Sequence, residues 1–440
     1  MASWSDPGRH HPGAGDRPGP TQVQTDRLEQ DMQWSELRMA GCLRAVVAIS
    51  VLLLSACATL PRNPVPAQYT PMATIPGMPD VRGWAGVPSV DLDQDFHLSM
   101  RQESSEDFPV GSDGVIVYPY LALSGGGSNG AFGAGFLNGW TASGRRPVFK
   151  IVTGVSTGAL MAPFVFIGTE GDKTLEHFYT TTSNDDVFTA GSVLMALLRR
   201  ESMADTRPLA ELIAQVADRE LLRKVAAEHG RGRRLYMGTV DLDSRRFTIW
   251  NMGRIAQYDT DQALALFRQV MLASSSFPVA FPAVLFDVEF EGRHYDEMHV
   301  DGFVGANLFA HVGTFDPSSI LRNDGPVPGR EHIYVIHNGQ LRPPPSPTQR
   351  SIGGIAMRVL EVSARAGVIG DLFREYAFAQ RNGSEFRWVT VAEDVDLPDA
   401  ADFNPVRMRE LFQIGFQAGQ GADAWETQPP AIGGQVTTPP

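Results

Sequence analysis

Two successive units, each made of a β-rich run, a glycine-containing turn and a helical pattern, constrain the fold of this chain more than any other feature. In the first unit, residues 115–124 (VIVYPYLALS) lead through the loop 125–130 (GGGSNG) into a helical stretch at 131–140. In the second, residues 149–167 (FKIVTGVSTGALMAPFVFI) repeat that order. Strands that alternate with helices across short loops form parallel sheets with helices on their faces. The sequence therefore predicts an α/β fold.

The first glycine loop matches the G-x-G-x-x-G pattern of dinucleotide-binding folds through Gly125, Gly127 and Gly130. That interpretation requires an acidic residue about 20 positions later, at the end of the second strand, to hold the ribose. The second strand instead runs into residues 154–158 (GVSTG), which contain no acidic residue. We therefore reject the nucleotide-binding interpretation.

Residues 154–158 match G-x-S-x-G, the pattern of a nucleophile elbow. Gly154 and Gly158 permit the sharp strand-to-helix turn that raises the hydroxyl of Ser156 clear of the backbone. An apolar strand precedes this serine and an apolar helical stretch follows it, as the elbow requires. The plainer alternative is that Ser156 only caps the helix. The context favours Ser156 as a catalytic nucleophile.

Three consecutive glycines at the start of the first helix are candidates for an oxyanion hole. Gly125, Gly126 and Gly127 expose backbone N–H groups at a helix N-terminus with no Cβ in the way. Such groups hold the negative charge that develops on a carbonyl oxygen when a serine attacks an ester. We expect these amides to act beside Ser156.

Residues 124–130 (SGGGSNG) together with residues 154–158 resemble the patatin-like phospholipase family. The family implies a third motif, Asp-Gly-Gly or Asp-Gly-Ala, and this chain has residues 301–303 (DGF). The family's segment of small residues that leads into prolines is similar to residues 273–282 (ASSSFPVAFP). The resemblance covers about residues 119–310, with the elements in the same order.

The resemblance implies a patatin-like three-layer α/β/α sandwich with a mostly parallel central sheet, in which Asp301 pairs with Ser156 in a dyad. It implies a calcium-independent serine acyl hydrolase, a phospholipase A or lysophospholipase, that cleaves acyl esters of membrane lipids through an acyl-enzyme. This chemistry needs neither a metal nor another cofactor. We expect the catalytic domain at 113–325 and a C-terminal completion of the same domain at 326–421.

Two residues depart from the family pattern. The family commonly has Arg or Lys at the position of Asn129, so the glycine loop lacks a fixed positive charge here. Phe303 stands where the family has a second small residue after the aspartate. We expect its ring to narrow the acyl or alcohol site.

Ten histidines offer competing partners for Ser156. His337 follows both Ser156 and Asp301, which is the order of a Ser-Asp-His triad in α/β-hydrolases and would fit a general esterase. His294 and His299 lie among acidic residues, an arrangement that raises the alternative of a metal site. Their spacing gives no helical i,i+4 pair, and we expect no metal there.

The first sixty residues contain a targeting signal. Residues 1–38 are polar and lack a hydrophobic period, as in a disordered extension or a stretch translated from an upstream start codon. After Met39, the apolar run 45–54 (AVVAISVLLL) is too short to span a bilayer of about 30 Å. Small residues then lead directly into Cys57. This segment resembles a bacterial lipoprotein signal peptide at 39–56.

The resemblance implies that Cys57 is lipidated and holds the protein on a membrane through acyl chains. The alternatives are an ordinary secretory signal and an uncleaved anchor. Ala58 is not the aspartate that retains lipoproteins at the inner membrane in enterobacteria, so we expect the outer membrane of a bacterial cell envelope, facing the periplasm. Repeated prolines predict an extended tether over 57–112.

Strand and helix patterns continue beyond the motifs. Apolar residues at 355, 359, 362, 366 and 369 follow helical spacing, and Asn404 and Pro405 are typical of a helix start. We expect this part to complete the core and cover the active-site edge. We expect residues 422–440 to form a loose tail.

Charge and composition exclude other classes of function. The formal net charge is −13, from 37 Lys+Arg and 50 Asp+Glu, which disfavours a nucleic-acid partner. Two cysteines cannot form a disulfide framework or a cysteine-rich zinc site. The remaining alternative of a different class is a catalytically silent lipoprotein that binds lipid in the same pocket.

Overall fold

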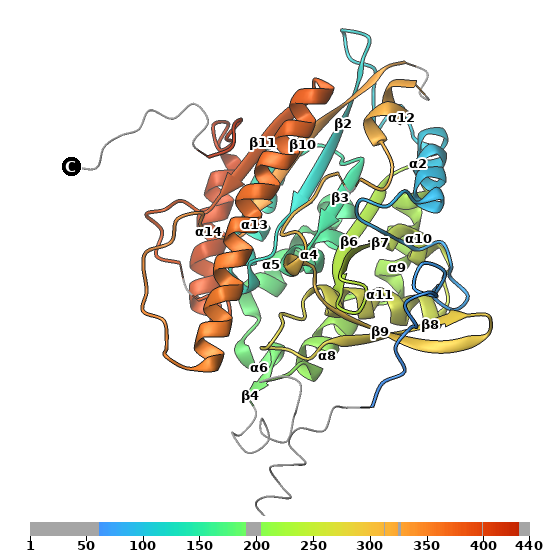
Figure 1. Cartoon of the computed structure of the whole chain (residues 1–440). Helices are drawn as coiled ribbons and strands as arrows, with labels where there is room; N and C mark the ends of the chain where they lie inside the picture. Colours follow the sequence, from blue (N-terminus) through green and yellow to red (C-terminus); the bar gives the residue numbers. More distant parts are fainter. Residues whose placement is uncertain (1–60, 191–203, 312, 324–326, 398, 431–440) are drawn as a thin grey trace, which may run out of the picture. The chain divides into compact units, whose positions relative to one another are not determined.

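The structure is a computed structural model of the whole chain, and it describes residues 61–190, 204–311, 313–323, 327–397 and 399–430 (Figure 1). Residues Arg62–Pro440 form a compact unit of their own. The predicted extension at 1–38, the signal peptide at 39–56 and Cys57 lie outside the described residues.

The strands are β1 (Arg82–Trp84), β2 (Ile116–Leu123), β3 (Ile151–Gly154), β4 (Thr189–Ala190), β5 (Ala204–Asp205), β6 (Arg234–Asp241), β7 (Arg246–Asn251), β8 (Val284–Phe290), β9 (Arg293–Asp301), β10 (Gly329–His337) and β11 (Glu385–Thr390). The helices are α2 (Val90–Gln102), α3 (Gly130–Ala142), α4 (Thr157–Phe166), α5 (Asp172–Thr181), α6 (Asn184–Val187), α8 (Arg207–Val216), α9 (Arg219–Gly230), α10 (Met252–Gln257), α11 (Asp261–Ser274), α12 (Pro317–Asn323), α13 (Ile352–Asn382) and α14 (Pro405–Gln420). Short 3₁₀ turns lie at Gly127–Asn129, Gly168–Gly171 and Gly302–Val304.

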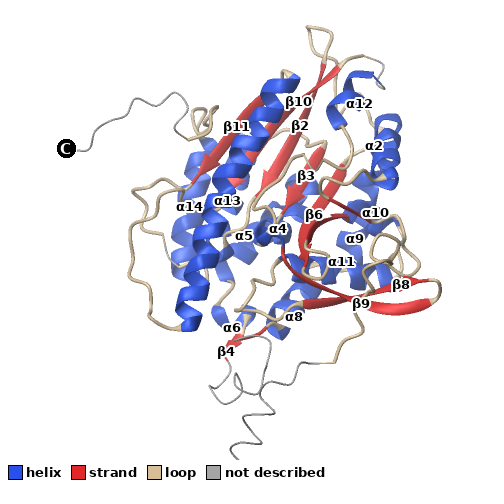
Figure 2. Ribbon diagram, viewed as in Figure 1, coloured by secondary structure: helices blue, strands red, loops and turns tan. Residues whose placement is uncertain are grey.

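The main sheet has nine strands in the order β1-β7-β6-β3-β2-β10-β11, with β9 on β6 and β8 on β9 (Figure 2). Strands β6, β3, β2, β10 and β11 are parallel, whereas β7, β1, β9 and β8 pair antiparallel to their neighbours. The sheet is therefore mostly parallel and helices cover both of its faces, which confirms the predicted three-layer α/β/α fold. Loops at the carboxyl ends of the parallel strands are the usual place for a site in such a sheet.

Alternate residues of β2 divide the core into its two halves. Leu121 and Leu123 pack into a cluster with residues of α3, α4 and α14. Tyr120 and Ala122 face the opposite way, into a cluster with residues of α2, α12 and α13. Because both faces of the sheet are covered, β2 is apolar along its whole length rather than alternating with polar residues.

The expected tether over 57–112 is wrong from residue 62 onward. β1 pairs antiparallel with β7 and extends the main sheet, and α2 begins at Ser89, whose side chain caps it. Prolines indicated an extended segment, but the apolar residues between and after them are buried. These residues are Ala73, Ile75, Met78, Val81, Leu92, Phe96 and Met100.

The C-terminal part of the chain contains a strand and a helix that pack with the rest. β11 and α14 belong to the same compact unit, and Asn404 caps α14 with Pro405 at its first position. The loose tail expected at 422–440 is wrong for residues 422–430, because Trp425 packs into an aromatic cluster. Its ring centroid lies 4.9 Å from those of Phe136 and Trp140 and 5.2 Å from that of Tyr334.

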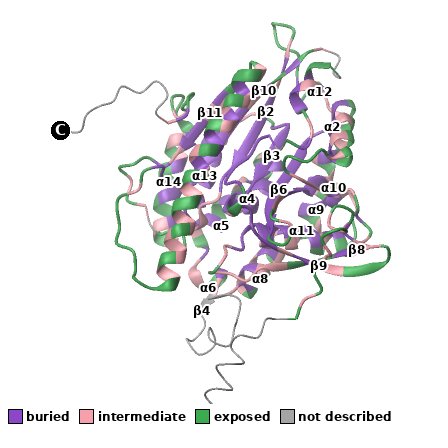
Figure 3. Cartoon of the chain, viewed as in Figure 1, coloured by how far each residue is buried: buried purple, intermediate pink, exposed green. Residues whose placement is uncertain are grey.

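The helix predicted around residues 355–369 forms as the first part of α13. Its apolar stripe is nevertheless exposed at Ile355, Val359 and Val362 (Figure 3). In the part of the chain that the structure describes, none of the helices is long and apolar enough to span a membrane.

Candidate active site

Ser156 lies where β3 turns sharply into α4. Its backbone has φ 55° and ψ −127°, a strained combination for a residue other than glycine and the one that a nucleophile elbow requires. A Cβ at Gly158 would collide with the backbone of Leu123, so the close approach of helix and strand requires glycine. The amide of Ser156 donates to Oγ of Ser274 at 3.0 Å, and that hydroxyl donates to the carbonyl of Gly238 at 2.7 Å. Ser274 thus fixes the elbow, a positioning role that its sequence motif did not reveal.

Asp301 ends β9 opposite Thr239 of β6, and its side chain is fully buried. Its Oδ1 accepts the amide of Phe303 at 3.0 Å, whereas Oδ2 has no hydrogen-bond partner among the described residues. Burial raises the pKa of Asp301 to about 7, and the Phe303 amide and the Ser156 hydroxyl offset part of that rise. A carboxylate with a pKa near neutrality is a better base toward a serine than an ordinary aspartate. Ser156 thus lies near enough to Asp301 to affect its pKa, although no hydrogen bond joins the two side chains in the structure.

The glycine loop follows the end of β2 and lies against Ser156. A Cβ on Gly125 would stand 3.0 Å from Cβ of Ser156 and 3.5 Å from its Oγ. Gly126 has a φ of 152°, which residues with a side chain rarely adopt. The amides of Gly125, Gly126 and Gly127 donate to no described residue, so they are free to bind an oxyanion beside the serine.

Asn338, just past β10, holds this loop in place. Its amide and its Nδ2 donate to Oγ and the carbonyl of Ser124, both at 2.9 Å, and its Oδ1 accepts the amide of Gly133 at 3.1 Å. A buried asparagine that bonds both ends of the glycine turn fixes the direction of the oxyanion amides. Sequence analysis assigned no role to Asn338, because its partners are more than 200 positions away.

A cavity of about 560 Å³ opens onto Ser156 and the glycine loop. Its volume falls within the usual range for a small-molecule ligand site, about 300–1,000 Å³. Aromatic side chains form much of its inner wall, and the ring of Phe303 stacks on that of Phe277 at 4.5 Å. The bulky residue that departs from the family pattern is thus part of the wall, as expected from its size. Further apolar lining residues are Leu160, Phe178, Val187, Leu209 and Phe281.

The outer wall of the cavity comes from α13 and carries charge. Arg358 pairs with Glu361 at 3.1 Å, whereas Arg365 makes no hydrogen bond or ion pair with a described residue. Burial lowers the pKa of Arg365, which shows that protein partly surrounds the guanidinium. Asn129 also lines the cavity, and its buried Oδ1 has no partner among the described residues. Arg365 therefore adds a cation to the wall of this cavity.

His337 lines the same cavity but is not arranged as a triad histidine. Its Nδ1 hydrogen-bonds Oγ1 of Thr390 at 2.8 Å, whereas Asp301 accepts the Phe303 amide and is influenced by the Ser156 hydroxyl, not by a histidine. Burial lowers the pKa of His337 to about 4, so it is neutral and a weak base at pH 7. The Ser-Asp-His order of the sequence is not reproduced in space.

The two histidines considered for a metal site do not converge. His294 is exposed and pairs with Asp287 at 3.0 Å, whereas His299 is buried and bonds Thr239 at 2.8 Å. The donor atoms of Asp241, Glu297 and His299 do lie within 4.8 Å of one another. Arg82 already forms an ion pair with Glu297 and holds the pKa of that carboxyl low, at about 2, against the effect of burial.

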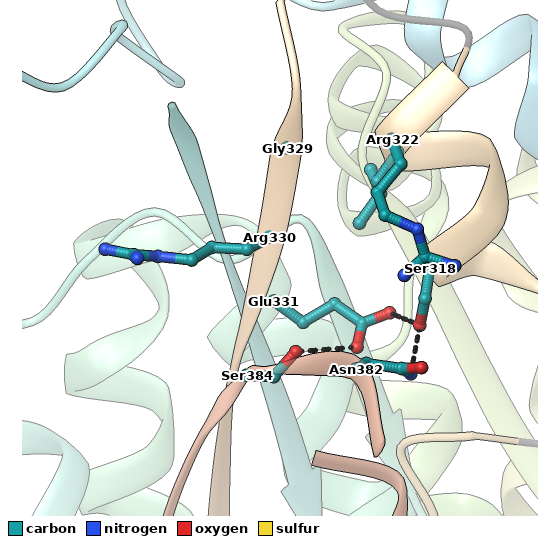
Figure 4. Close-up of a pocket in the computed structure, with 8 residues that line it drawn as sticks. Ser318, Arg322, Gly329, Arg330, Glu331, Asn382 and Ser384 are labelled. Carbon is teal, nitrogen blue, oxygen red and sulfur yellow. Dashed lines mark hydrogen bonds between the residues drawn. The ribbon is translucent and has the colours of Figure 1, made fainter. Parts of the chain in front are cut away.

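A second cavity, of about 10 Å³, is far too small for a substrate (Figure 4). In it, Glu331 accepts the hydroxyl of Ser318 at 2.6 Å and that of Ser384 at 3.3 Å. The same carboxylate lies 3.2 Å from Nε2 of His311, whose Nδ1 is 2.8 Å from Glu375. Hydrogen bonds to these two carboxylates raise the pKa of His311 to about 10, against the opposing effect of burial. This buried Glu-His-Glu network ties α12, β10 and α13 together.

Comparisons with known proteins agree with the motifs. Residues 121–313 match the family model described as patatin-like phospholipase. Comparison with curated protein sequences found no significant match.

Structures that are similar to this chain at low TM-scores include VipD from Legionella pneumophila, with 10% identity, a TM-score of 0.31, and coverage of 73% of this chain and 70% of VipD. ExoU of Pseudomonas aeruginosa, in complex with SpcU, has 14% identity, a TM-score of 0.28, and coverage of 70% and 53%. Human GIVD cytosolic phospholipase A2 has 10% identity, a TM-score of 0.25, and coverage of 65% and 51%. The chain thus spans about half the length of the last two proteins.

The matched region runs from the end of β2 to past Asp301 and includes the glycine loop, Ser156 and the parallel strands β3 and β6. The parallel strands β10 and β11 lie beyond it. The order of elements in the matched region is the one that the sequence motifs predicted. Residues 121–313 are therefore similar to the patatin-like phospholipase family, and the chain has the patatin fold.

Proposed function

We propose that this protein is a serine-dependent lipid acyl hydrolase, a phospholipase A or lysophospholipase, that acts through a dyad of Ser156 and Asp301. The proposal is supported by a strained serine on the cavity wall whose hydroxyl affects the pKa of a fully buried carboxyl, raised by burial to about 7. Burial of this kind is costly to a fold and is typical of catalytic groups. The adjoining apolar cavity provides room for an acyl chain.

The reaction proceeds in two halves. Asp301 accepts the proton of Ser156 as Oγ bonds to the ester carbonyl carbon, and the amides of Gly125 to Gly127 hold the oxyanion. The bond from carbonyl carbon to alcohol oxygen then breaks, and the proton passes from Asp301 to the leaving alcohol. Water gives a proton to Asp301 and attacks the acyl-enzyme, and the fatty acid leaves as the proton returns to Ser156. No step requires calcium, because the amides supply the positive field.

A phosphate-bearing substrate is supported by the cation in the outer wall. Arg365 lies on the same cavity as Ser156 and makes no direct ion pair with a described residue, although the charge of Glu361 acts on it. A phosphate at this position would satisfy the guanidinium through charge-assisted hydrogen bonds. Arg365→Gln should lower kcat/KM for phospholipids about tenfold or more and leave a neutral short-chain ester within about twofold, an outcome that a merely structural role would not give.

We further propose that the protein is lipidated at Cys57 after cleavage of residues 39–56 and resides on the outer membrane, facing the periplasm. The proposal is supported by the apolar run and the small residues that precede Cys57. Palmitate labelling should be lost in Cys57→Ser, and that variant should no longer fractionate with membranes in the same way. Unchanged fractionation would contradict the anchor.

A fluorophosphonate probe tests the hydrolase proposal against a silent lipid-binding lipoprotein. Wild type should be labelled covalently at Ser156, and Ser156→Ala should not be labelled. Asp301→Asn should retain the fold and lose turnover by several orders of magnitude. A folded wild-type protein that resists the probe would favour the lipid-binding alternative.

A further inference from the structure

The N-terminal half of α13 has an apolar face that no described residue covers. Ile352, Ile355, Val359 and Val362 are 92%, 52%, 58% and 55% exposed. At about 100° per residue, these four positions fall within roughly 80° of one another around the helix axis. Four aliphatic side chains in a row on one exposed helix face are unusual for a soluble surface, and they mark an interaction site.

The opposite face of the same helix lines the catalytic cavity. Met357, Glu361, Ala364 and Val368 belong to the cavity wall and lie on the side away from the stripe. A helix with its side chains is about 10 Å across, so only that thickness separates the exposed stripe from the cavity. In Figure 1, α13 lies across the front of the sheet, and Figure 3 shows exposed positions along it. Whatever binds the stripe is therefore held about one helix diameter from the cavity.

The charge of this segment is opposite to that of the whole chain. Between residues 342 and 370 there are four arginines, at 342, 350, 358 and 365, and a single acidic residue, Glu361. The chain as a whole carries a net charge of −13. An apolar stripe flanked by arginines is typical of a helix that lies in the interface of an anionic bilayer.

We propose that the exposed face of α13, defined by Ile352, Ile355, Val359 and Val362, docks onto a phospholipid bilayer that contains anionic lipids. The aliphatic side chains enter the interface, and Arg350, which makes no ion pair with a described residue, meets the headgroups. Arg342 already pairs with Glu393 at 3.8 Å. The bilayer is preferred over a second copy of the chain because the arginines suit an anionic surface and the adjoining cavity takes substrate from it. That last argument rests on the proposed lipid hydrolase function, whereas the stripe and the charges do not.

Vesicle binding of the chain that begins at Ala58 tests the proposal without the acyl anchor. That chain contains the whole compact unit Arg62–Pro440. The test variant is Ile355→Gln/Val359→Gln, which keeps the charge and uses a good helix former. The control is Val90→Gln/Val406→Gln, which changes two valines that are 69% and 56% exposed on α2 and α14. Co-sedimentation with phosphatidylglycerol–phosphatidylcholine vesicles gives the partition coefficient, and a soluble short-chain ester gives turnover.

The test variant should lose at least tenfold in vesicle partition, and the control should stay within twofold. Arg350→Gln should weaken binding to the anionic vesicles about fivefold, with no change on pure phosphatidylcholine. All variants should turn over the soluble ester at the wild-type rate within twofold. Undiminished vesicle binding by the test variant would overturn the proposal. If wild type is a dimer and the test variant is a monomer, the face instead binds a second copy of the chain, which would also overturn the proposal. The protein could also bind vesicles through α13 and yet hydrolyse neither ester nor lipid. That result would support the docking face and refute the proposed function.

Discussion

The raised pKa of Asp301 predicts that the catalytic base destabilises the fold, and that Asp301→Asn relieves this cost. The pKa is about 7 in the folded protein against an ordinary value of 3.8. Between these two values the folded protein holds one proton that the unfolded chain has released. Each pH unit of rise therefore lowers the free energy of unfolding by about 1.4 kcal/mol. The destabilisation caused by the raised pKa reaches about 4 kcal/mol in total. It is absent below pH 3.8 and complete above pH 7.

Asparagine matches the shape of Asp301 and removes the titration. Its amide oxygen accepts the Phe303 amide in place of Oδ1, and its amino group takes the place of Oδ2, which has no hydrogen-bond partner among the described residues. Urea unfolding at pH 5 and pH 8 measures the effect. Relative to Asp301→Asn, wild type should lose about 3 kcal/mol of unfolding free energy between these two pH values.

Ser156→Ala is the matched control, since it abolishes the nucleophile but retains the buried carboxyl. It should show the pH dependence of wild type, whereas Asp301→Asn should not. The kcat/KM of wild type on a soluble ester should rise with pH through about 7, as the base loses its proton. Equal pH dependence of stability in wild type and Asp301→Asn would refute the assignment of Asp301 as a buried, proton-holding base.

Three further predictions concern the surroundings of the dyad. His337→Ala should lower kcat/KM less than tenfold, and a loss of several orders of magnitude with the fold intact would replace the dyad by a triad. Gly126→Ala, at φ 152°, should lower kcat at least about 100-fold by displacing the oxyanion amides, as steady-state kinetics would detect. His311 has a pKa raised from 6.5 to about 10 by Glu331 and Glu375, so its stabilisation is fully present below pH 6.5 and is lost as the pH rises through 10. Urea unfolding from pH 7 to pH 10.5 should show that loss in wild type and a flatter profile in His311→Gln.

The strand–loop–helix units and the motif residues could be predicted from the sequence, because each depends on local chemistry. A G-x-S-x-G between a strand and a helix requires the turn found at Ser156, and the carboxyl ends of parallel strands gather at one edge of the sheet. The burial that raises the pKa of Asp301 could not be predicted in this way, because it arises from elements far apart in the chain.

The segments before and after the matched domain were harder to predict, because their packing depends on partners that the sequence does not name. A free tether and a segment packed against a domain can both be rich in proline. Ile75 and Val81 are buried, so this segment is packed against the domain. Trp425 packs into an aromatic cluster with Trp140. Its neighbours in the sequence are mostly polar or glycine, so nothing in the sequence indicated this packing. Helical spacing correctly located α13, but spacing alone does not tell whether Val359 faces a core or solvent.

Ser274 and Asn338 were missed for the same reason. Each orients the catalytic groups through hydrogen bonds across more than 100 positions of sequence. Neither lies in a pattern that assigns it a partner, so only the folded structure reveals their positions.

The central claim is that Ser156 and Asp301 hydrolyse lipid acyl esters without a metal. The most direct measurement incubates the chain from Ala58 onward, beside Ser156→Ala and Asp301→Asn, with mixed phospholipids, lysophospholipids and a short-chain ester in EDTA, and identifies the products by mass spectrometry. Free fatty acid should be released by wild type alone, and the accompanying product would name the substrate. No release by folded wild type, or equal release by Ser156→Ala, would contradict the account.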